Sequence, residues 1–506
     1  MSDSTSDTKP QSDSIRFVLD GDIVELRDVD PTRTVLQFLR EDLLRTGTKE
    51  GCAEGDCGAC TVVIAEINRD GNDLSVRAIN SCIQFLPTLD GKELITVESL
   101  GGAGDLHPVQ KAMVDHHGSQ CGFCTPGFVM SLFALYKTNA KPTRREIDDA
   151  LAGNLCRCTG YRPIIAAAEA MYEAQTEVDW LRQPGAKASA QKYKPPSERI
   201  AALQSLRRTE SMQLHSNGRR FFAPTSADEF AGLLAAHPDA TILAGGTDIG
   251  LWVTKQHREL DTVIYTGRVA ELNELNTSAT HIEIGAAVSL SDAMVAIVEH
   301  YPALDEVFTR FASPPIRNAG TLGGNIANGS PIGDSMPALM VAGATLVLRR
   351  GRSSRESSLE DFYIDYQVKD LRPSEFIESI RIPLPTEGVV LNSHKLSKRF
   401  DQDISAVCTA YRLQLDGDKV VSFRMACGGL AAIIKRATQA EAVITGATWN
   451  EATIEAAALA LAQDFTPISD MRASADYRLR ATQNLLHRFF LETRGELAET
   501  VYGYGR

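Results

Sequence analysis

Three cysteines crowd one glycine-rich stretch near the start of the chain. Residues Gly51–Thr61 run Gly-Cys-Ala-Glu-Gly-Asp-Cys-Gly-Ala-Cys-Thr, so that Cys52, Cys57 and Cys60 follow the spacing C-x4-C-x2-C, and Cys82 comes later. This is the plant-type spacing for a [2Fe–2S] cluster. Glycine permits the tight backbone curvature that converging thiolates need, and the N–H groups of such a loop can point at the sulfurs. The four cysteines are therefore predicted to bind one [2Fe–2S] cluster.

Four further cysteines lie between segments with helical patterns. They form a C-x2-C pair and a much later C-x-C pair, and a proline follows each pair where a helix could begin. Proline suits the first turn of a helix, and the positive end of the helix dipole favours thiolates. We expect both pairs at helix N-termini, facing one another around a second cluster. The predicted ligands are Cys121, Cys124, Cys156 and Cys158.

Structural zinc is the alternative for both sets. Zinc sites usually pair cysteines as two separated C-x2–4-C knuckles, whereas three of these cysteines crowd a single loop. Cys408 and Cys427 lie in or beside apolar strand patterns and are expected to be small buried hydrophobes. His116 and His117 point about 100° apart on a helix, which predicts a surface feature rather than a site. No catalytic triad, P-loop or HExxH motif occurs, and no general base for substrate chemistry is evident.

Two glycine-rich loops in the middle of the chain could bind phosphates. They cover Ala244–Gly250 and Arg317–Asp334, and neither has the pattern G-x-G-x-x-G of a Rossmann site. Such loops are often only turns, but two in one domain could direct several N–H groups at a pyrophosphate. Flavin is the expected dinucleotide, because flavin converts between one- and two-electron chemistry.

The surrounding pattern predicts several domains of mixed α and β structure, since 506 residues exceed one core. Strands at 15–19, 23–26, 61–67, 74–79 and 94–97 with a helix at 34–44 indicate a small mixed sheet. Helices are expected at 107–117, 128–136, 145–151 and 164–174. Strands at 240–243, 262–264, 281–284, 409–415 and 420–426 follow, with helices between 451 and 497. The predicted divisions are a disordered tail (1–14), the first cluster domain (15–98), a helical cluster domain (99–178), a linker (179–216), a nucleotide-binding domain (217–388) and a C-terminal domain (389–506).

The composition limits the class of protein. A net charge of −13 argues against a general nucleic-acid or anionic-membrane binder. No apolar run is long enough to span a bilayer, and the polar N-terminus has no signal core or twin arginine. A cytoplasmic location is therefore expected, where clustered cysteines more often indicate metal or redox chemistry than disulfides.

The cysteine motifs carry a family likeness. GCAEGDCGACTV with Cys82, QCGFCTPGFVM at 120–130 and GNLCRCTGYRPI at 153–164 resemble the Fe–S region of the molybdenum hydroxylases. The following parts resemble their flavin domains, and an arrangement without a molybdenum domain is similar to the small Fe–S/FAD subunit of bacterial xanthine dehydrogenases. The resemblance implies an α+β multidomain fold: a ferredoxin-like β-grasp domain, a four-helix-bundle domain, an α/β FAD-binding domain of the PCMH (vanillyl-alcohol-oxidase-like) type and an α+β C-terminal domain.

The resemblance also implies roles for single residues. The first four cysteines would bind the cluster nearer the flavin and the second four the one nearer the molybdenum site of a partner, with Gln120 at the pterin. Tyr366 and Phe400–Ile404 would lie where NAD approaches. Asp248, where many animal enzymes have glutamate, and the less charged loop at 400–402 depart from the pattern. The implied FAD contacts are Thr241, Ile242, Leu243, Ala244, Gly245, Gly246, Thr247, Asp248, Phe311, Thr321, Leu322, Gly323, Gly324, Asn325, Asp334, Ile377 and Lys395.

The implied activity is that of an electron-transfer subunit of a xanthine dehydrogenase. A molybdenum-binding large subunit would oxidise hypoxanthine or xanthine, and electrons would cross both [2Fe–2S] clusters to FAD and then to NAD+. The usual assembly in the family is a heterotetramer with two copies of each chain. Three alternatives stay open: the same module serving an aldehyde or N-heterocycle hydroxylase, a stand-alone NAD(P)H flavoprotein reductase, and a zinc-stabilised binding module.

Overall fold

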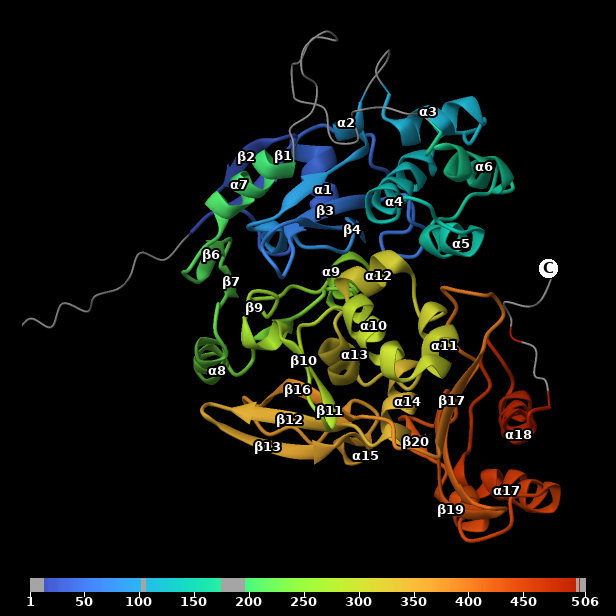
Figure 1. Cartoon of the computed structure of the whole chain (residues 1–506). Coiled ribbons are helices and arrows are strands. Elements are labelled where there is room, and N and C mark those ends of the chain that lie inside the picture. Colours follow the sequence, from blue (N-terminus) through green and yellow to red (C-terminus); the bar gives the residue numbers. More distant parts are fainter. Residues whose placement is uncertain (1–12, 102–105, 174–195, 497–499, 501–506) are drawn as a thin grey trace, which may run out of the picture. The chain divides into compact units, whose positions relative to one another are not determined.

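The computed structural model describes residues 13–101, 106–173, 196–496 and 500. The predicted tail, 1–14, lies almost entirely outside this part. The chain forms two compact units, the first reaching to Ala270 and including Pro314–Gly320, the second made of Glu271–Ser313 and the chain from Thr321. Figure 1 colours the elements along the sequence. Among the described helices, none combines the length and apolar character needed to cross a bilayer.

The first cluster domain is a five-stranded mixed sheet with a short helix, as predicted. The sheet has the order β2-β1-β5-β3-β4, in which β1 and β5 are parallel and the other pairs antiparallel. Two expected bounds were wrong: Val97 begins a helix instead of ending a strand, and the helix expected at 34–44 ends early, with Leu44 77% exposed. The elements are β1 Ile15–Leu19, β2 Asp22–Leu26, α1 Val35–Gln37, the π-helical turn Phe38–Asp42, β3 Thr61–Ile67, β4 Leu74–Asn80, β5 Glu93–Ile95 and α2 Val97–Leu100.

The four predicted helices of the second domain are present. Their buried side chains, among them Phe128, Phe133 and Ile164, form one core with residues of β3 and β4. His107 caps the first of these helices through its Nδ1, which accepts from the Val109 N–H at 3.3 Å. The helices are α3 Pro108–Asp115, α4 Thr125–Thr138, α5 Arg144–Leu151 and α6 Arg162–Ala170.

The stretch predicted as a linker, 179–216, is not structureless where the structure describes it. It contains α7, Pro196–Leu206, and β6, Met212–Ser216. Leu203 and Leu206, three residues apart, pack on Val18 of β1. Arg199 forms a buried ion pair with Glu93, 2.6 Å between Nη2 and Oε2. Both partners are distant in sequence, so the local pattern of prolines did not reveal this helix.

A second buried carboxylate, that of Asp90, connects β1 to the segments that follow α7 and β9. Asp90 is 2% exposed at its side chain and accepts from Arg208 Nε at 3.0 Å and Arg268 Nη1 at 3.1 Å. The Arg16 N–H also donates to it at 2.8 Å. One carboxylate therefore compensates the guanidinium groups of two arginines and also accepts from the backbone of β1.

We expect Asp90→Asn to destabilise the first unit strongly. Removing one partner of a buried ion pair leaves uncompensated charge and costs about 3–5 kcal/mol. Denaturant titration followed by far-ultraviolet circular dichroism measures this loss. The control is Asp70→Asn in an exposed turn, where we expect about 0.5 kcal/mol or less. Equal midpoints for both variants would contradict the assignment.

The remaining sheet of the first unit has the order β6-β7-β9-β8, with β7, β9 and β8 mutually parallel. The predicted strands at 240–243 and 262–264 are β8 and β9. The Pro314–Ala319 helix belongs to this unit because the Asn318 side chain donates to the Ala78 carbonyl at 2.9 Å. The elements are β7 Arg219–Ala223, α8 Ala227–Ala236, β8 Thr241–Leu243, α9 Ile249–Thr254, β9 Thr262–Tyr265 and α12 Pro314–Ala319.

The second unit contains a five-stranded and a four-stranded sheet, besides the two-stranded sheet β14-β15. The first has the order β10-β11-β16-β12-β13 and shares its core with α10, α13 and α14. The elements are β10 Leu275–Thr277, β11 His281–Gly285, α10 Leu290–His300, α11 Asp305–Thr309, α13 Leu322–Asn328, α14 Ser335–Ala342, β12 Thr345–Arg350, β13 Ser353–Ser358, α15 Leu359–Phe362, β14 Tyr363–Asp365, β15 Val368–Lys369 and β16 Phe376–Pro383.

The C-terminal sheet is antiparallel with the order β17-β18-β19-β20. Tyr411, fully buried, stacks on Phe489 with ring centroids 4.6 Å apart, which holds the last helix on the sheet. Cys408 and Cys427 are buried at 1% exposure, as predicted. The elements are β17 Val389–Leu396, β18 Val407–Asp416, β19 Lys419–Gly428, β20 Lys435–Arg436, α16 Thr438–Ile444, α17 Glu451–Asp464 and α18 Ala475–Thr493.

Candidate functional site

The structure brings the first four cysteines together. Cys52, Cys57 and Cys60 lie in the loop before β3, and Cys82 follows β4. Side-chain hydrogen bonds with Cys57 and Cys82 lower the pKa of Cys52. Hydrogen bonds with Cys52 and Cys60 raise the pKa of Cys82, so neighbouring pairs of thiols connect all four cysteines. They come from two segments that the pairing of β3 with β4 holds together.

Main-chain groups of this loop point at the sulfurs, as predicted. The N–H groups of Cys57 and Glu54 donate to Cys52 Sγ at 3.3 and 3.5 Å. The Asn80 amide donates to Cys60 Sγ at 3.8 Å. Donors directed at sulfur stabilise a negatively charged cluster and raise its reduction potential. The loop thus fits a plant-type [2Fe–2S] cluster.

The second four cysteines form two pairs across the domain. Burial, followed by a hydrogen bond with Cys156, raises the pKa of Cys124 to about 12. A side-chain hydrogen bond with Cys121 raises the pKa of Cys158. Each pair therefore takes one cysteine from C-x2-C and one from C-x-C, an arrangement that a single cluster between the two motifs would require.

One part of this prediction was wrong. Cys124 directly precedes α4, but α6 begins only at Arg162, after Tyr161 in a left-handed conformation with φ 68°. Cys156 is stabilised instead by Thr159, whose N–H and Oγ1 lie 3.5 and 3.1 Å from its Sγ. Burial raises the pKa of Cys156, but these contacts outweigh it and lower the pKa. Of the two motifs, only C-x2-C therefore lies directly at a helix N-terminus, where the helix dipole acts.

Zinc fits this arrangement poorly. Within the described residues, no three His, Cys, Asp or Glu side chains converge in a way that would hold one metal ion. Structural zinc needs four ligands around one point, whereas the two irons of a [2Fe–2S] cluster share four cysteines. Pairwise neighbouring thiols match the second requirement.

The two cysteine loops lie against one another within the first unit. The Leu155 N–H donates to the Cys57 carbonyl at 3.0 Å, which links the residue before Cys156 to the backbone of Cys57. The Asn154 amide donates to the Gly58 carbonyl at 3.1 Å. Gly58 has φ +70°, and a Cβ there would lie 2.0 Å from the Gly153 carbonyl oxygen. Only glycine allows this close approach.

The same loop also contacts the first predicted flavin loop. Thr254 of α9 donates to the Ala53 carbonyl at 2.8 Å. A Cβ on Gly250 would lie 2.5 Å from the Ile83 carbonyl oxygen, next to Cys82. Leu251 and Ile316 pack on Cys60 and Cys82. The first cluster loop therefore lies between the second cluster domain and the segment 244–250.

Gly245 allows the first predicted flavin loop to approach the segment Pro314–Gly320 of the same unit. A Cβ at this position would lie 2.0 Å from the Ala319 carbonyl oxygen and 2.5 Å from Gly320 Cα. Asp248 is the N-cap residue of α9 without a side-chain capping bond. The glycines of the motif thus serve a close approach of two backbones.

The second loop begins α13. Thr321 is its N-cap residue and accepts from the Gly324 N–H at 2.9 Å. Asn325 Oδ1 accepts from Ser335 Oγ at 2.6 Å, which ties this helix to α14. The loop therefore presents a helix N-terminus, a site that favours phosphate. Its FAD contacts stay a prediction.

Asp334 and Lys395 form a buried ion pair. Lys395 Nζ donates to Asp334 Oδ2 at 2.7 Å and to the Arg310 carbonyl at 3.0 Å, with both side chains at most 2% exposed. Ser405 donates to Asp334 Oδ1 at 2.6 Å. Two of the three Nζ protons are used within the protein, which leaves one for a ligand. The pair joins β17 to α14 and to the residue before Phe311.

The other predicted flavin and partner residues lie in different surroundings. The Ile377 side chain is part of the hydrophobic core at 6% exposure, so any contact with a ligand would have to use its backbone. Phe311 is partly buried at the edge of the same core. Tyr366, in the turn between β14 and β15, is 59% exposed, and Gln120 is exposed. Their roles stay predictions.

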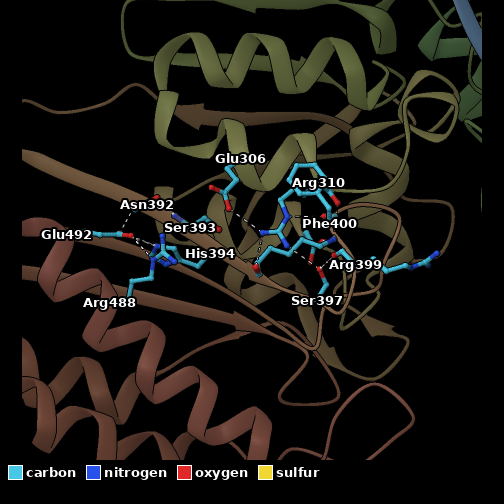
Figure 2. A network of polar contacts seen from close by, with 12 residues as sticks. Glu306, Arg310, Asn392, Ser393, His394, Ser397, Arg399, Phe400, Arg488 and Glu492 are labelled. Carbon is cyan, nitrogen blue, oxygen red and sulfur yellow. Dashed lines mark hydrogen bonds and ion pairs between the residues drawn. The ribbon is translucent and has the colours of Figure 1, made fainter. Parts of the chain in front are cut away.

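Arg310, which sequence reasoning missed, organises the loop after β17. Its guanidinium group donates to the carbonyls of Lys395 and Phe400 at 3.0 and 2.9 Å and lies over the Phe400 ring (Figure 2). It also bonds Ser397 Oγ at 3.2 Å and Glu306 at 3.2 Å. Its partners other than Glu306 follow 85 or more residues later. Only its place next to the aromatic Phe311 could have drawn attention to it.

A second part of this network links β17 to α18. The Glu492 carboxylate accepts from Asn392 Nδ2 at 2.8 Å and Arg488 Nε at 2.8 Å, and lies 3.0 Å from His394 Nε2 (Figure 2). Burial raises the pKa of Glu492, but the contacts with His394 and Arg488 outweigh it and hold the pKa below its ordinary value.

This carboxylate predicts a pH dependence. Because the folded pKa lies below the unfolded one, near 4.3, the stabilisation is present above about pH 4.3 and is lost as pH falls through the folded pKa. Hydrogen exchange of α18 amides should therefore accelerate below pH 5, beyond the intrinsic change. In Glu492→Gln we expect faster exchange at pH 7 and a weaker pH dependence. An identical pH dependence in both proteins would contradict this.

Family models match four consecutive parts of the chain. Residues 17–84 match a 2Fe-2S iron-sulfur cluster binding domain, and residues 96–169 match a [2Fe-2S] binding domain. Residues 214–385 match the FAD binding domain in molybdopterin dehydrogenase. Residues 392–493 match the CO dehydrogenase flavoprotein C-terminal domain. The matched segments carry all eight predicted cluster ligands and both predicted flavin loops.

Curated relatives resemble nearly the whole chain. Xanthine dehydrogenase of Emericella nidulans is 34% identical over 97% of this chain and 39% of its own length. Xanthine dehydrogenase/oxidase of Rattus norvegicus is 30% identical over 95% of this chain and 39% of its own length. The chain thus spans about two fifths of the length of these relatives.

Solved structures resemble somewhat more than half of the chain. Carbon monoxide dehydrogenase from Hydrogenophaga pseudoflava is 27% identical with a TM-score of 0.52, covering 55% of this chain and 98% of that chain. Quinoline 2-oxidoreductase from Pseudomonas putida 86 is 26% identical with a TM-score of 0.50, covering 55% and 97%. The predicted multidomain fold with two 2Fe-2S domains, an FAD-binding domain and a C-terminal flavoprotein domain is confirmed.

Proposed function

Because this chain belongs to the molybdenum hydroxylase family, as its Fe–S and flavin portion, we propose that it conducts electrons between a molybdenum centre and a soluble acceptor. The route runs from the cluster of Cys121, Cys124, Cys156 and Cys158 to that of Cys52, Cys57, Cys60 and Cys82, and then to FAD. Flavin, when bound, exchanges electrons singly or in pairs.

One observation carries this proposal: the first cluster loop contacts both of its supposed neighbours. Leu155, next to Cys156, donates to the Cys57 carbonyl at 3.0 Å on one side. On the other side Thr254 donates to the Ala53 carbonyl at 2.8 Å. A serial path through three centres requires this order, with the Cys52–Cys60 loop in the middle.

We propose xanthine or hypoxanthine as the reductant and NAD+ as the acceptor. The similarity to xanthine dehydrogenases over 97% of the chain supports the purine substrate. Hydroxylation would take place on a molybdenum-binding large subunit, in a cytoplasmic heterotetramer with two copies of each chain. Tyr366 and the loop at 400–404 would receive NAD+, and Gln120 would face the pterin.

A second candidate is the same module serving another molybdenum hydroxylase. The likeness to carbon monoxide dehydrogenase and to quinoline 2-oxidoreductase favours it. In each case the similarity covers nearly all of the matched chain, at 26–27% identity. The two candidates differ in the substrate of the partner and not in the path within this chain.

The test is anaerobic reduction of the purified holoprotein from the flavin end. With excess NADH we expect flavin bleaching first, followed by two distinct EPR signals from reduced clusters. Xanthine should produce the same signals only when the molybdenum subunit is present. Flavin reduction without cluster signals would overturn the path, and xanthine without effect on the complex would favour the second candidate.

Gly58→Val provides an internal check. A side chain at this position would meet the Gly153 carbonyl and push the two cysteine loops apart. We expect slower reduction of the second cluster by NADH in stopped-flow measurements, while flavin reduction keeps its rate. The control is Gly71→Ala, where a Cβ would meet nothing within 4 Å.

A further inference from the structure

The C-terminal sheet places three arginines around one cavity. The cavity, of about 650 Å³, is lined by Arg412 of β18, Arg424 of β19 and Arg436 of β20, together with the hydroxyl residues Ser422, Thr438 and Thr445. Figure 1 shows β19 and β20 beside α14 in the C-terminal part of the chain. The volume lies within the range of sites for small molecules, about 300–1,000 Å³.

The register of the sheet brings two of these charges face to face. Arg412 of β18 and Arg424 of β19 are direct cross-strand partners. Like charges directly opposite one another destabilise a sheet. Burial and repulsion by Arg436 lower the pKa of Arg424, consistent with this crowding. An anion bound between the two guanidinium groups would offset this repulsion.

The carboxylates of the protein compensate this cluster incompletely. Glu360 accepts from Arg424 Nη2 at 3.2 Å and from Arg436 Nη1 at 2.8 Å. Glu441 accepts from Arg436 Nε at 3.0 Å and from the Met425 N–H at 2.8 Å. Arg424 and Arg436 thus share these two carboxylates, and all three nitrogens of Arg436 are used.

Arg412 supplies the unused positive charge. In the described part of the chain its side chain makes no hydrogen bond or ion pair, although it lines the cavity and is partly buried. Arg424 uses only Nη2 toward Glu360, so its other edge is available within the same described region. Two guanidinium groups on neighbouring strands can therefore donate to one ligand.

We propose that this cavity binds a phosphate-bearing small anion, held by Arg412 and Arg424. Guanidinium groups match phosphate oxygens in a bidentate manner. Three or more phosphate oxygens can serve two guanidinium groups and a nearby hydroxyl, whereas a single carboxylate offers only two oxygens. The volume exceeds that of one phosphate group, which indicates a diphosphate or a phosphorylated organic molecule.

The test uses the FAD-loaded holoprotein and inorganic pyrophosphate as the probe. Isothermal titration should show one site for pyrophosphate, and Arg412→Gln should weaken it at least tenfold. Arg480→Gln, an exposed arginine on α18, is the control and should leave the affinity unchanged. Citrate at equal concentration separates phosphate from carboxylate chemistry. Flavin absorbance and circular dichroism verify that each variant is folded.

Two results would overturn the proposal. Binding of pyrophosphate with equal affinity to the Arg412→Gln and Arg480→Gln variants would place the anion elsewhere. If the wild-type protein bound citrate more tightly than pyrophosphate, the site would be one for carboxylates and not for phosphates. Arg412→Lys, which keeps the charge but not the fork, should recover only part of the affinity, and full recovery would contradict bidentate binding.

Discussion

Replacing Cys156 by serine should remove one of two cluster signals and leave the other intact. Cys156 pairs with Cys124, and its Sγ accepts from the Thr159 N–H at 3.5 Å. Serine keeps the shape but is a poor iron ligand, so the cluster of the helical domain is lost. The iron content should fall from about four to about two per chain, and EPR of the dithionite-reduced protein should show a single signal.

The control for this experiment is Cys408→Ala. Cys408 is buried in β18, and its thiol approaches the Asp334 carbonyl at 3.8 Å, far in sequence from the eight predicted ligands. Both signals should persist in this variant. Two unchanged signals in Cys156→Ser would contradict the ligand assignment, and loss of both signals in the control would show that the assay reports general unfolding.

Lys395→Met should abolish flavin binding. It leaves the Asp334 carboxylate buried without its cation, a change that costs about 3–5 kcal/mol where a pair is fully buried. It also removes the hydrogen bond from Lys395 Nζ to the carbonyl of Arg310, the residue directly before Phe311. We expect a flavin content near zero, measured by absorbance at 450 nm of the purified protein against the iron content. Lys419→Met, exposed on β19, should keep its flavin.

A double variant distinguishes packing from direct contact with the flavin. Replacing a buried ion pair by apolar side chains of similar size is often neutral or stabilising, so Asp334→Leu with Lys395→Met should recover much of the lost stability. If the flavin stays absent while stability returns, the pair contacts the flavin. Recovery of both would mean that the pair only supports the fold of α14 and β17.

The eight cluster ligands were predictable because the cysteine spacing itself carries the chemistry. The structure places these cysteines in two separate neighbourhoods, while their role as ligands stays a prediction. Strands such as Ile15–Leu19 and Thr61–Ile67 had the expected bounds. The hydrophobic alternation along these strands is strong and local. Predictions from such patterns need no knowledge of distant partners.

Features that depend on distant partners were missed. The helix Pro196–Leu206 gains its stability from Val18 and Glu93, more than one hundred residues earlier. Arg310 depends on carbonyls of Lys395 and Phe400. The second helix N-terminus was wrong because Tyr161 takes a left-handed conformation that local propensity disfavours. In each case tertiary contacts decide, and the local sequence does not contain them.

The contact between Gly58 and Gly153 has a consequence for biogenesis. The Cys57 carbonyl and the Leu155 N–H that meet here are almost one hundred positions apart. During synthesis, the ferredoxin-like domain can form its own sheet before residues 153–155 leave the ribosome, but its ligand loop lacks part of its backbone support until then. We therefore expect the first cluster loop to gain its full backbone support only after residues 153–155 dock on it. Iron delivered before that step would meet a more open loop.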